Sequence, residues 1–508
     1  MMVSPPTAEK PLRVVIVGGG TAGWMAASLM AHHWGARARV TVLESPDIGI
    51  IGVGEGSTPQ LKAFFDTLGI TEAEWMPGCN ATYKAGIRVV GWSEKPGYAS
   101  YFHPFATAID GHTAPSFFWS TRARRTGRDV WAHGDRFFLS ERLAAERLCP
   151  IPADNFPFAI GYGYHFDATL AGRFLRDHAT AKLGVTYLER TVASASLAED
   201  GSIAALLCDD GEAIAGDIFV DASGFRSLLM QQALGEPFIA FADNLFNDRA
   251  VAIPSPLKDG GLPPETRATA LSAGWAWAIP LTNRTGNGYV YSSHYLSQDA
   301  AEAELRDHLG IGDEGEARHL SMKVGRVERS WVKNCLAVGL SQGFIEPLEA
   351  TALHIVQATI EGFMAAYDED SGDGARDAFN NRLNARYDGI RDYIVCHYRM
   401  NGRTDTPYWR DNAANQSLSN NLKAMLTAWF TAGDLEAEIE RLGIGGYYAA
   451  LSWHCLFAGY GQFPDAAKIK PPETGLAMPD MAVIDHFVAA CARNFGDHAS
   501  AVAALAKG

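Results

Sequence analysis

The sequence predicts an α/β fold in which a Rossmann-like nucleotide-binding module is interleaved with a largely helical module. Two observations support this prediction. A β-rich run at Arg13–Val17, a glycine turn, a helix-forming run at Trp24–Trp34 and a second strand at Arg39–Leu43 follow in the order of a βαβ unit. Residues 350–450 then have mainly helical patterning.

The glycine turn has the spacing of a dinucleotide-binding fingerprint. It has the form GxGxxG, and Glu44 ends the next strand, 21 residues after the last glycine, Gly23. Such glycines let the backbone approach a pyrophosphate at the helix N-terminus, and the acid accepts hydrogen bonds from ribose hydroxyls. We therefore expect a dinucleotide to contact the turn and the acid: Gly18, Gly19, Gly20, Thr21, Ala22, Gly23 and Glu44.

The fingerprint occurs once. The glycine-rich stretch Gly52–Gly56 has a different spacing and no strand-to-helix context, so it predicts a loop that passes close to a ligand. An enzyme that binds two dinucleotides through Rossmann units needs two fingerprints. We therefore expect a separate protein to reduce the bound cofactor.

A further segment, Asp221–Ser227, follows the apolar run Ile218–Val220. It resembles the stretch with which flavin monooxygenases return to their FAD domain. The alternative is an ordinary strand-to-turn junction. Since no low-complexity linker interrupts the chain, we expect residues 1–508 to form a single integrated unit.

Composition excludes several classes of protein. The formal net charge of −15 argues against a broad surface for nucleic acid or anionic membrane. The seven cysteines are scattered without a CxxC pair, so we expect no metal site and a reducing, cytoplasmic location. No apolar run approaches the ~18 residues of a membrane span.

Two tryptophans at alternate positions distinguish the stretch Gly274–Pro280, which reads GWAWAIP. Taken alone, it predicts a strand with one aromatic face. It also resembles the GWxWxIP signature of flavin-dependent halogenases, especially the tryptophan-halogenase branch. The resemblance runs from about residue 12 to 461 and includes these further motifs: Val15–Trp24, Ile51–Glu55, Tyr83–Ile87, Tyr101–Phe105, Phe344–Glu349 and Asp405–Trp409.

The resemblance implies a halogenase. Reduced FAD, O₂ and a halide, bromide or chloride, would give hypohalous acid, which travels through a tunnel to a separate aromatic site. Trp275 and Trp277 would form the wall between the two sites. The FAD-binding module would comprise approximately residues 12–100, 160–235 and 325–365, and the substrate module approximately 101–159, 236–324 and 366–508.

Catalytic roles also follow from the resemblance. Lys84 matches the family lysine that hydrogen-bonds hypohalous acid or forms a haloamine with it, although an isolated lysine in a strand-like run is usually a solvated surface residue. Glu349 matches the carboxylate that stabilises the ring cation and accepts its proton, and Glu346 is the residue with which it could be confused. A halide would bind the backbone at Thr351 and Ala352.

That halide segment departs from the common Ser-Thr-Gly, because Ala350 and Ala352 replace the serine and the glycine. Alanine keeps the backbone N–H but disfavours positive φ. A change in halide affinity or choice would follow if the glycine conformation matters there. Further FAD contacts that the resemblance implies are Ser45, Ile48, Gly54, Glu55, Val192, Asp221 and Leu340.

The substrate region matches less well. His103, Phe105 and Trp453 fit positions that border the substrate, with a structural role as the alternative for the histidine. The lid over residues 425–450 looks shorter than in tryptophan halogenases, and Tyr447 and Tyr448 do not carry over safely. We therefore expect a more open site for indole, a substituted indole or a larger indole-bearing molecule.

Two competing functions remain at this point. One is an FAD-dependent aromatic hydroxylase, and the other is an inactive FAD-binding protein that has lost halide binding, an alternative that rests on Ala350 and Ala352. The paired tryptophans and the pair Lys84 and Glu349 favour the halogenase, because a hydroxylase needs neither a barrier nor a relay lysine. The expected partners are a separate NAD(P)H-dependent flavin reductase and a small aromatic substrate, without nucleic acid or membrane. For the oligomeric state we consider a homodimer.

Overall fold

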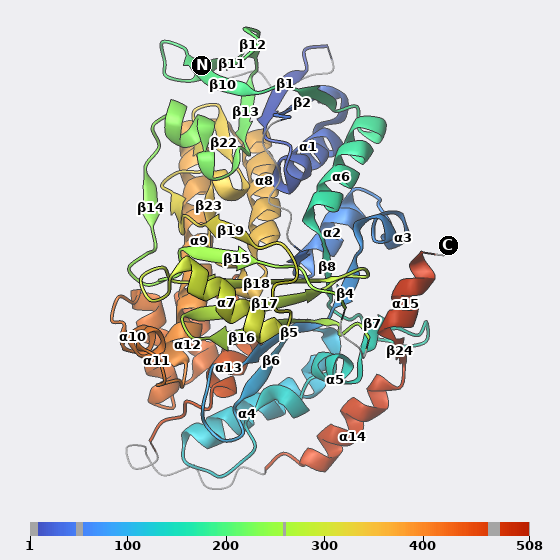
Figure 1. The fold of residues 1–508 in the computed structure, drawn as a ribbon, viewed down its shortest axis with the longest axis vertical. Helices are drawn as coiled ribbons and strands as arrows, with labels where there is room; N and C mark the ends of the chain where they lie inside the picture. The colour runs from blue at the N-terminus through green and yellow to red at the C-terminus, as the bar shows by residue number, and fades with distance from the viewer. Residues whose placement is uncertain (1–8, 47–53, 258–260, 466–477, 507–508) are drawn as a thin grey trace. The chain divides into compact units, whose positions relative to one another are not determined.

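The computed structural model describes residues 9–46, 54–257, 261–465 and 478–506. The chain forms two compact units that interleave along the sequence (Figure 1). The first contains Met1–Asn80, Phe166–Ala242 and Met322–Asp388, and the second contains Ala81–His165, Asp243–Ser321 and Gly389–Gly508. Relative to the expected module bounds, residues 81–100 and 160–165 fall in the second unit, and residues 236–242, 322–324 and 366–388 fall in the first.

The first unit is built on a six-stranded sheet with the order β21-β22-β13-β1-β2-β9. The five strands from β22 to β9 run parallel, and β21 is antiparallel to β22. Its strands are β1 (Leu12–Val17), β2 (Ala38–Glu44), β9 (Thr186–Glu189), β13 (Ile218–Asp221), β21 (Trp331–Val332) and β22 (Cys335–Ala337). β1 is a nearly continuous buried run of β-branched residues, as expected for a central parallel strand.

Three helices pack in this unit: α1 (Thr21–Trp34), α6 (Ala168–Lys182) and α8 (Ala352–Glu369). α1 contacts both α6 and α8, and most of its surface is buried. A helix that is apolar on all sides is stable only in such a buried position. Smaller elements complete the unit: β3 (Gly54–Gly56), α2 (Gln60–Thr67), α3 (Glu72–Trp75), β10 (Val192–Leu197), β11 (Ile203–Cys208), β12 (Ala213–Ala215), β14 (Phe238–Ala240), β20 (Gly325–Val327) and β23 (Gly343–Phe344).

The second unit is built on a seven-stranded sheet with the order β19-β15-β18-β17-β16-β5-β6. Its neighbours are antiparallel except for β16 and β5. The strands are β5 (Gly86–Val90), β6 (Ser100–Pro104), β15 (Arg249–Ala252), β16 (Glu265–Leu271), β17 (Gly274–Pro280), β18 (Thr285–Tyr291) and β19 (Arg318–Ser321). Ala276, Tyr289 and Tyr291 pack from this sheet onto α7 (Gln298–Leu309).

Helices make up much of the rest of the second unit: α4 (Ala114–Arg125), α5 (Leu139–Glu146), α10 (Pro407–Ala414), α11 (Asn420–Phe430), α12 (Leu435–Leu442), α13 (Ala450–Gly459), α14 (Met481–Ala492) and α15 (His498–Leu505). The long helix α9 (Asp373–Met400) belongs to the second unit from Gly389 onward. The short strands are β4 (Thr82–Lys84), β7 (Leu148–Pro152), β24 (Phe495–Asp497) and β8 (Gly163–Asp167), whose first three residues lie in this unit.

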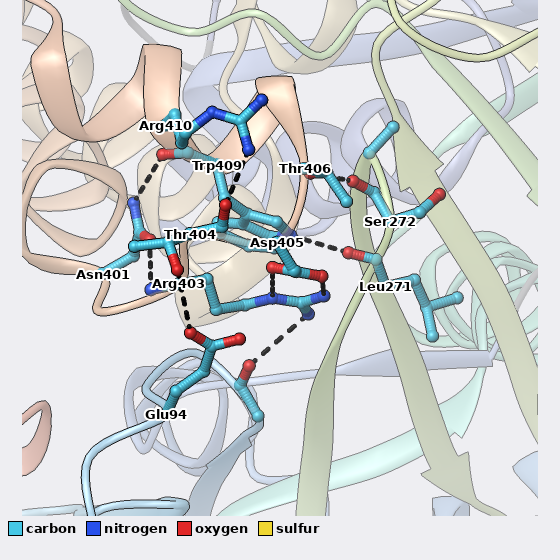
Figure 2. A network of polar contacts seen from close by, with 12 residues as sticks. Glu94, Leu271, Ser272, Asn401, Arg403, Thr404, Asp405, Thr406, Trp409 and Arg410 are labelled. Carbon is cyan, nitrogen blue, oxygen red and sulfur yellow. Dashed lines mark hydrogen bonds and ion pairs between the residues drawn. The ribbon is translucent and has the colours of Figure 1, made fainter.

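The segment Asp405–Trp409 fixes α10 to the sheet (Figure 2). Thr406 Oγ1 donates to Ser272 O over 2.7 Å, and Trp409 Nε1 donates to Leu271 O over 2.7 Å. Both acceptors lie at the turn from β16 to β17. The motif is therefore structural here, because it holds the turn that precedes Trp275.

Within the described part of the chain, no helix is long and apolar enough to cross a membrane. Among the same residues, no group of three or more His, Cys, Asp or Glu side chains is placed to hold a metal ion.

Candidate active site and cofactor site

The glycine turn between β1 and α1 has room for no side chain at two positions. A Cβ on Gly18, whose φ is +116°, would lie 2.2 Å from Ala222 O, and a Cβ on Gly23 would lie 2.0 Å from Gly18 O. Gly20 caps α1 without a side-chain hydrogen bond, and no acidic residue occupies the first turn of that helix. The turn therefore presents backbone amides and the positive end of the helix dipole, as a pyrophosphate requires.

Glu44 lies directly beside this turn. A Cβ on Gly19 would come within 2.2 Å of Glu44 Oε2, so a larger residue there would have to displace this carboxylate. Burial raises the pKa of Glu44, an effect opposed by the charge of Arg176. Ser45 follows, and its Oγ lies 2.7 Å from Thr191 Oγ1. These residues fit FAD: the turn would hold the pyrophosphate, and the carboxylate of Glu44 would hold ribose hydroxyls.

Asp221 organises the loop that crosses the glycine turn. Its buried carboxylate accepts hydrogen bonds from Ser223 N and Oγ, Leu229 N and Met230 N at 2.6–3.1 Å. Because the protein supplies four donors, the carboxylate mainly positions this loop, whose Ala222 covers Gly18. The sequence predicted a cofactor contact at this residue without indicating that its side chain is already engaged.

The other predicted cofactor residues of the first unit have different surroundings. Val192 is 4% exposed, and its side chain packs in the apolar core with Val15 and Val17. Leu340 follows Gly339, where a Cβ would lie 2.8 Å from the Cβ of Ala22, so this segment runs beside the start of α1. Thr21 donates through Oγ1 to Ala168 O over 3.3 Å.

On the glycine-rich stretch, Gly54 and Glu55 form part of β3, whereas Ile48 lies outside the described residues. Burial, with a contribution from the charge of Asp167, raises the pKa of Glu55 to about 7. Its carboxyl group therefore changes charge near neutral pH.

Glu349 ends a short 3₁₀ turn before α8. It is 3% exposed, and Glu346 is fully buried. Ala350 then adopts a left-handed conformation with φ +55°, and Thr351 precedes the first residue of α8. The first amides of a helix have no intrahelical acceptor, so those of Thr351 and Ala352 suit an anion such as halide.

The strain at this segment differs from the sequence-based expectation. Ala352, which replaces the family glycine, has helical backbone, whereas Ala350 occupies the left-handed region. Alanine at position 352 therefore carries no strain. Ala352 therefore gives no structural reason to expect that halide binding has been lost.

Lys84 is not a surface residue. It ends β4, pairs with Gly163 of β8 and is 0% exposed. Its Nζ lies 5.2 Å from the ring centroid of the half-buried Phe105. Burial and the charge of Lys84 hold the pKa of the neighbouring His165 well below its ordinary value, so that imidazole is neutral. Lys84 is therefore a buried cation beside an aromatic ring.

Trp275 and Trp277 lie on one face of β17, as the alternation predicted. Both are buried, and their ring centroids are 6.4 Å apart with an interplanar angle of 61°. The ring of Trp277 covers Gly288 of β18, where a Cβ would lie 2.1 Å from Cη2 and Cζ2. Gly288 therefore determines where this ring can lie.

The strand register extends that aromatic face across the sheet. A row of directly paired residues consists of Gly288, Trp277, Ala268, Val89 and Tyr101. Directly paired residues share a face, and so do residues two apart on one strand. His103 therefore lies on the same face of the sheet as both tryptophans.

His103 is fixed by α13. Its Nε2 lies 2.9 Å from Ser452 Oγ, and its ring packs 6.0 Å from that of Tyr393. Tyr393 donates to Ser452 O over 2.9 Å and contacts Trp453 edge-on with centroids 4.9 Å apart. The sequence motifs single out His103 and Trp453 but not Tyr393 and Ser452, because nothing in the helical patterning distinguishes these two residues.

The predicted site residues thus form two groups, each within its own unit. The first unit holds the glycine turn with Glu44, and also Glu349 with the start of α8. The second unit holds Lys84 beside Phe105 and the sheet face that carries the tryptophans and His103.

Comparison with known proteins identifies the family. A model of the tryptophan halogenase family matches residues 13–471. The 7-chloro-L-tryptophan 6-halogenase KtzR of Kutzneria sp. (strain 744) is 37% identical, over 93% of this chain and 95% of that protein. The tryptophan 7-halogenase RebH of Lentzea aerocolonigenes is 35% identical, over 89% and 90%. A solved flavin-dependent halogenase from Xanthomonas campestris matches with a TM-score of 0.85 and 33% identity, over 97% and 98%.

These matches confirm the family and the α/β fold with its Rossmann-like module, and they do not favour the hydroxylase. Flavin-dependent halogenases are oxidoreductases that use FADH₂ with halide as a co-substrate. The family generally needs a separate flavin reductase and a small aromatic substrate. The chain belongs to the tryptophan halogenase family and is a flavin-dependent halogenase.

Proposed function

We propose that this halogenase acts on an indole-like, electron-rich ring, with Lys84 delivering the oxidised halogen and Glu349 accepting the ring proton. The observation that carries the proposal is the fully buried position of Lys84 beside Phe105, in the unit whose sheet carries Trp275 and Trp277 on one face. A buried cation is costly, and such a position is characteristic of a residue with a chemical task.

Bound FADH₂ would supply, together with O₂, the two-electron oxidation of halide to hypohalous acid. The Lys84 ammonium can donate a hydrogen bond to the oxygen of that acid and so polarise the oxygen–halogen bond. Alternatively, its neutral amine takes the halogen and releases water, forming a haloamine. The ring then attacks the halogen, and the carboxylate of Glu349 accepts the proton that leaves the ring carbon.

The remaining residues bind and orient. We assign the pyrophosphate to the glycine turn and the halide to the amides of Thr351 and Ala352. Trp275 and Trp277 exclude water from the aromatic site, and His103 and Phe105 border the ring that reacts. We further propose that the first unit is the FAD module, that the protein acts in the cytoplasm with an NAD(P)H-dependent reductase, and that it forms a homodimer.

Lys84→Ala tests the role of the lysine. Protein, FAD, flavin reductase, NADH and bromide are incubated with indole, and the product is measured by mass spectrometry. A 1,3-diketone in solution traps hypohalous acid that escapes. Because a positioned catalytic group contributes about 10²–10⁴-fold, bromoindole should fall by at least about 100-fold. NADH-dependent trapping by the diketone should continue.

Lys62→Ala is the matched control, since Lys62 is partly exposed and pairs with Asp66 four residues away. It should leave both products unchanged. Bromoindole formation by Lys84→Ala at the wild-type rate would contradict the proposal, and so would a hydroxylated product that forms without halide. Glu349→Gln should likewise keep flavin oxidation while losing most ring halogenation.

A further inference from the structure

The ladder between β5 and β16 extends beyond the two strands toward Lys84. Gly86, the first residue of β5, lies opposite Glu265, the first residue of β16, in a parallel register. One residue earlier on each segment, Ala85 N donates to Pro264 O over 2.7 Å. The two backbones are therefore still bonded to each other at the residue that follows Lys84.

The side chain of His498 takes the place of the next bond in this ladder. Two residues earlier on each segment, Tyr83 N donates to His498 Nε2 over 3.1 Å. The other ring nitrogen, Nδ1, lies 2.8 Å from Leu262 O. A hydrogen bond that would run directly between the two backbones is thus relayed through an imidazole. The ladder in this form holds the backbone on both sides of Lys84.

These contacts require one tautomer of a neutral imidazole. A backbone N–H only donates and a carbonyl oxygen only accepts, so Nε2 must carry the lone pair and Nδ1 the proton. The side chain of His498 is 0% exposed. A second proton, on Nε2, would place two N–H donors against each other in a position closed to solvent. Because a buried donor without an acceptor is destabilising, protonation would open the ladder at this point.

The backbone that carries this ring is itself held in place. Helix α15, which begins at His498, contacts β4 and β7 (Figure 1). His498 N donates to Arg147 O over 3.0 Å, and Asp497 pairs with Leu148 across β24 and β7. His498 lies after residues 13–471, which the family model matches, so the family motifs do not identify it.

Ionisable groups surround the imidazole on the elements that it contacts: Asp497 before it in the chain, Arg147 at its backbone, Tyr83 and Lys84 on β4, and His165 on β8. Burial lowers the pKa of His498, an effect opposed by the hydrogen bond to Leu262 and by the charge of Asp497. The imidazole is therefore neutral near pH 7, as the two hydrogen bonds require, and gains a proton only in more acidic solution.

We propose that His498 is a positioning residue for Lys84, because its neutral imidazole holds the backbone of β4 and thereby keeps the lysine where the halogen is transferred. The inference rests on the proposed function, since His498 acts only through Lys84. A misplacement of about 1 Å in a positioned group can cost about 100-fold in rate. Loss of this bond should therefore reduce ring halogenation without stopping the flavin chemistry that produces hypohalous acid.

Two substitutions separate the hydrogen bonds from the bulk of the side chain. His498→Leu removes both bonds, whereas the amide of His498→Gln supplies one donor and one acceptor and takes up no proton. His486→Leu is the matched control, because His486 is an exposed histidine of the neighbouring helix α14. Hydrogen exchange of the FAD-free protein, followed by mass spectrometry, should be at least about tenfold faster at the Tyr83 amide in His498→Leu. It should stay unchanged in His486→Leu.

Activity is measured as bromoindole and as diketone-trapped product. Bromoindole should fall by at least about tenfold in His498→Leu while NADH-dependent trapping continues. His498→Gln should retain most of the wild-type bromoindole at neutral pH. As the solution is acidified, the ratio of bromoindole to trapped product should fall more steeply for the wild type than for His498→Gln, whose amide does not titrate. In a Lys84→Ala background, His498→Leu should change bromoindole by less than about twofold, because the group through which it acts is absent.

Unchanged exchange at Tyr83 in His498→Leu overturns the proposal, and so does a tenfold loss of bromoindole that persists in the Lys84→Ala background. Both results leave the role of Lys84 intact. If His498→Leu does not fold, His498→Gln decides, since an acid loss as steep as that of the wild type also overturns the proposal. Bromoindole formed by Lys84→Ala at the wild-type rate refutes the proposed function instead, and the exchange measurement then still decides whether His498 holds β4.

Discussion

Gly288→Ala should displace the ring of Trp277, which supplies the three heavy atoms nearest to the added Cβ. The added Cβ would lie 2.1 Å from Cη2 and Cζ2 of that ring, whereas ordinary van der Waals contact begins near 3.4 Å. The ring must therefore shift by about 1.3 Å or the strands must separate. Overpacking of this kind costs about 1–3 kcal/mol.

A double-mutant cycle measures this contact. Trp277→Ala alone should destabilise the protein by about 3–5 kcal/mol, because it empties a buried aromatic position. Adding Gly288→Ala to it should cost less than about 0.5 kcal/mol, since the ring that it would strike is absent. Thermal unfolding followed by circular dichroism gives the three changes, with Gly111→Ala as the control because a Cβ there meets nothing within 4 Å.

The functional consequence is a second readout. With the ring displaced, more hypohalous acid should reach the diketone trap and less should reach indole, so the ratio of bromoindole to trapped product should fall. The reasoning would be refuted if Gly288→Ala destabilised the Trp277→Ala protein as strongly as the wild type. A wild-type product ratio in a protein shown to be destabilised would refute the role of the ring as a wall.

Three further predictions concern the first unit. Gly19→Ala should weaken FAD binding by at least about tenfold in a fluorescence titration, because its Cβ would lie 2.2 Å from the carboxylate of Glu44. Gly78→Ala is the control and should leave FAD binding unchanged, because the space around its Cβ is open. Ala350→Gly should raise the melting temperature, since the left-handed conformation costs alanine about 1 kcal/mol, and Ala358→Gly within α8 should lower it. Glu55 binds a proton more tightly in the folded chain, where burial raises its pKa from 4.5 to about 7. The free energy of unfolding of the FAD-free protein should therefore fall by up to about 3 kcal/mol as pH rises from about 4.5 to 7. Glu55→Gln should flatten this pH dependence. An unchanged pH dependence in Glu55→Gln would contradict the role of Glu55.

Local features of the fold could be predicted from the sequence. The sequence predicts a strand at 13–17, a glycine turn at 18–23, a helix at 24–34 and a second strand at 39–43. The structure has β1 at Leu12–Val17, α1 at Thr21–Trp34 and β2 at Ala38–Glu44. Hydrophobic periodicity and glycine spacing encode these elements within about 30 residues.

Long-range pairing could not be predicted in this way. β5 and β16 are parallel neighbours although they are far apart in sequence, and no local pattern records that Val89 lies opposite Ala268. The backbone at Ala350 is another case. Alanine signals no left-handed turn, and the packing of the buried residues Glu349 and Thr351 on either side overrides its preference.

The sheet of the second unit brings two motifs that are distant in sequence onto one face. Trp277 and His103 belong to separate motifs, yet the uninterrupted register through Ala268 and Val89 places them on one face. Strands hold side chains more precisely than loops do, which a halogenation site requires because regiochemistry depends on ring orientation. Ser452 then fixes the His103 ring from α13, the helix that also carries Trp453. Because His103 is proposed to border the reacting ring, freeing its imidazole by Ser452→Ala should alter which ring carbon is halogenated.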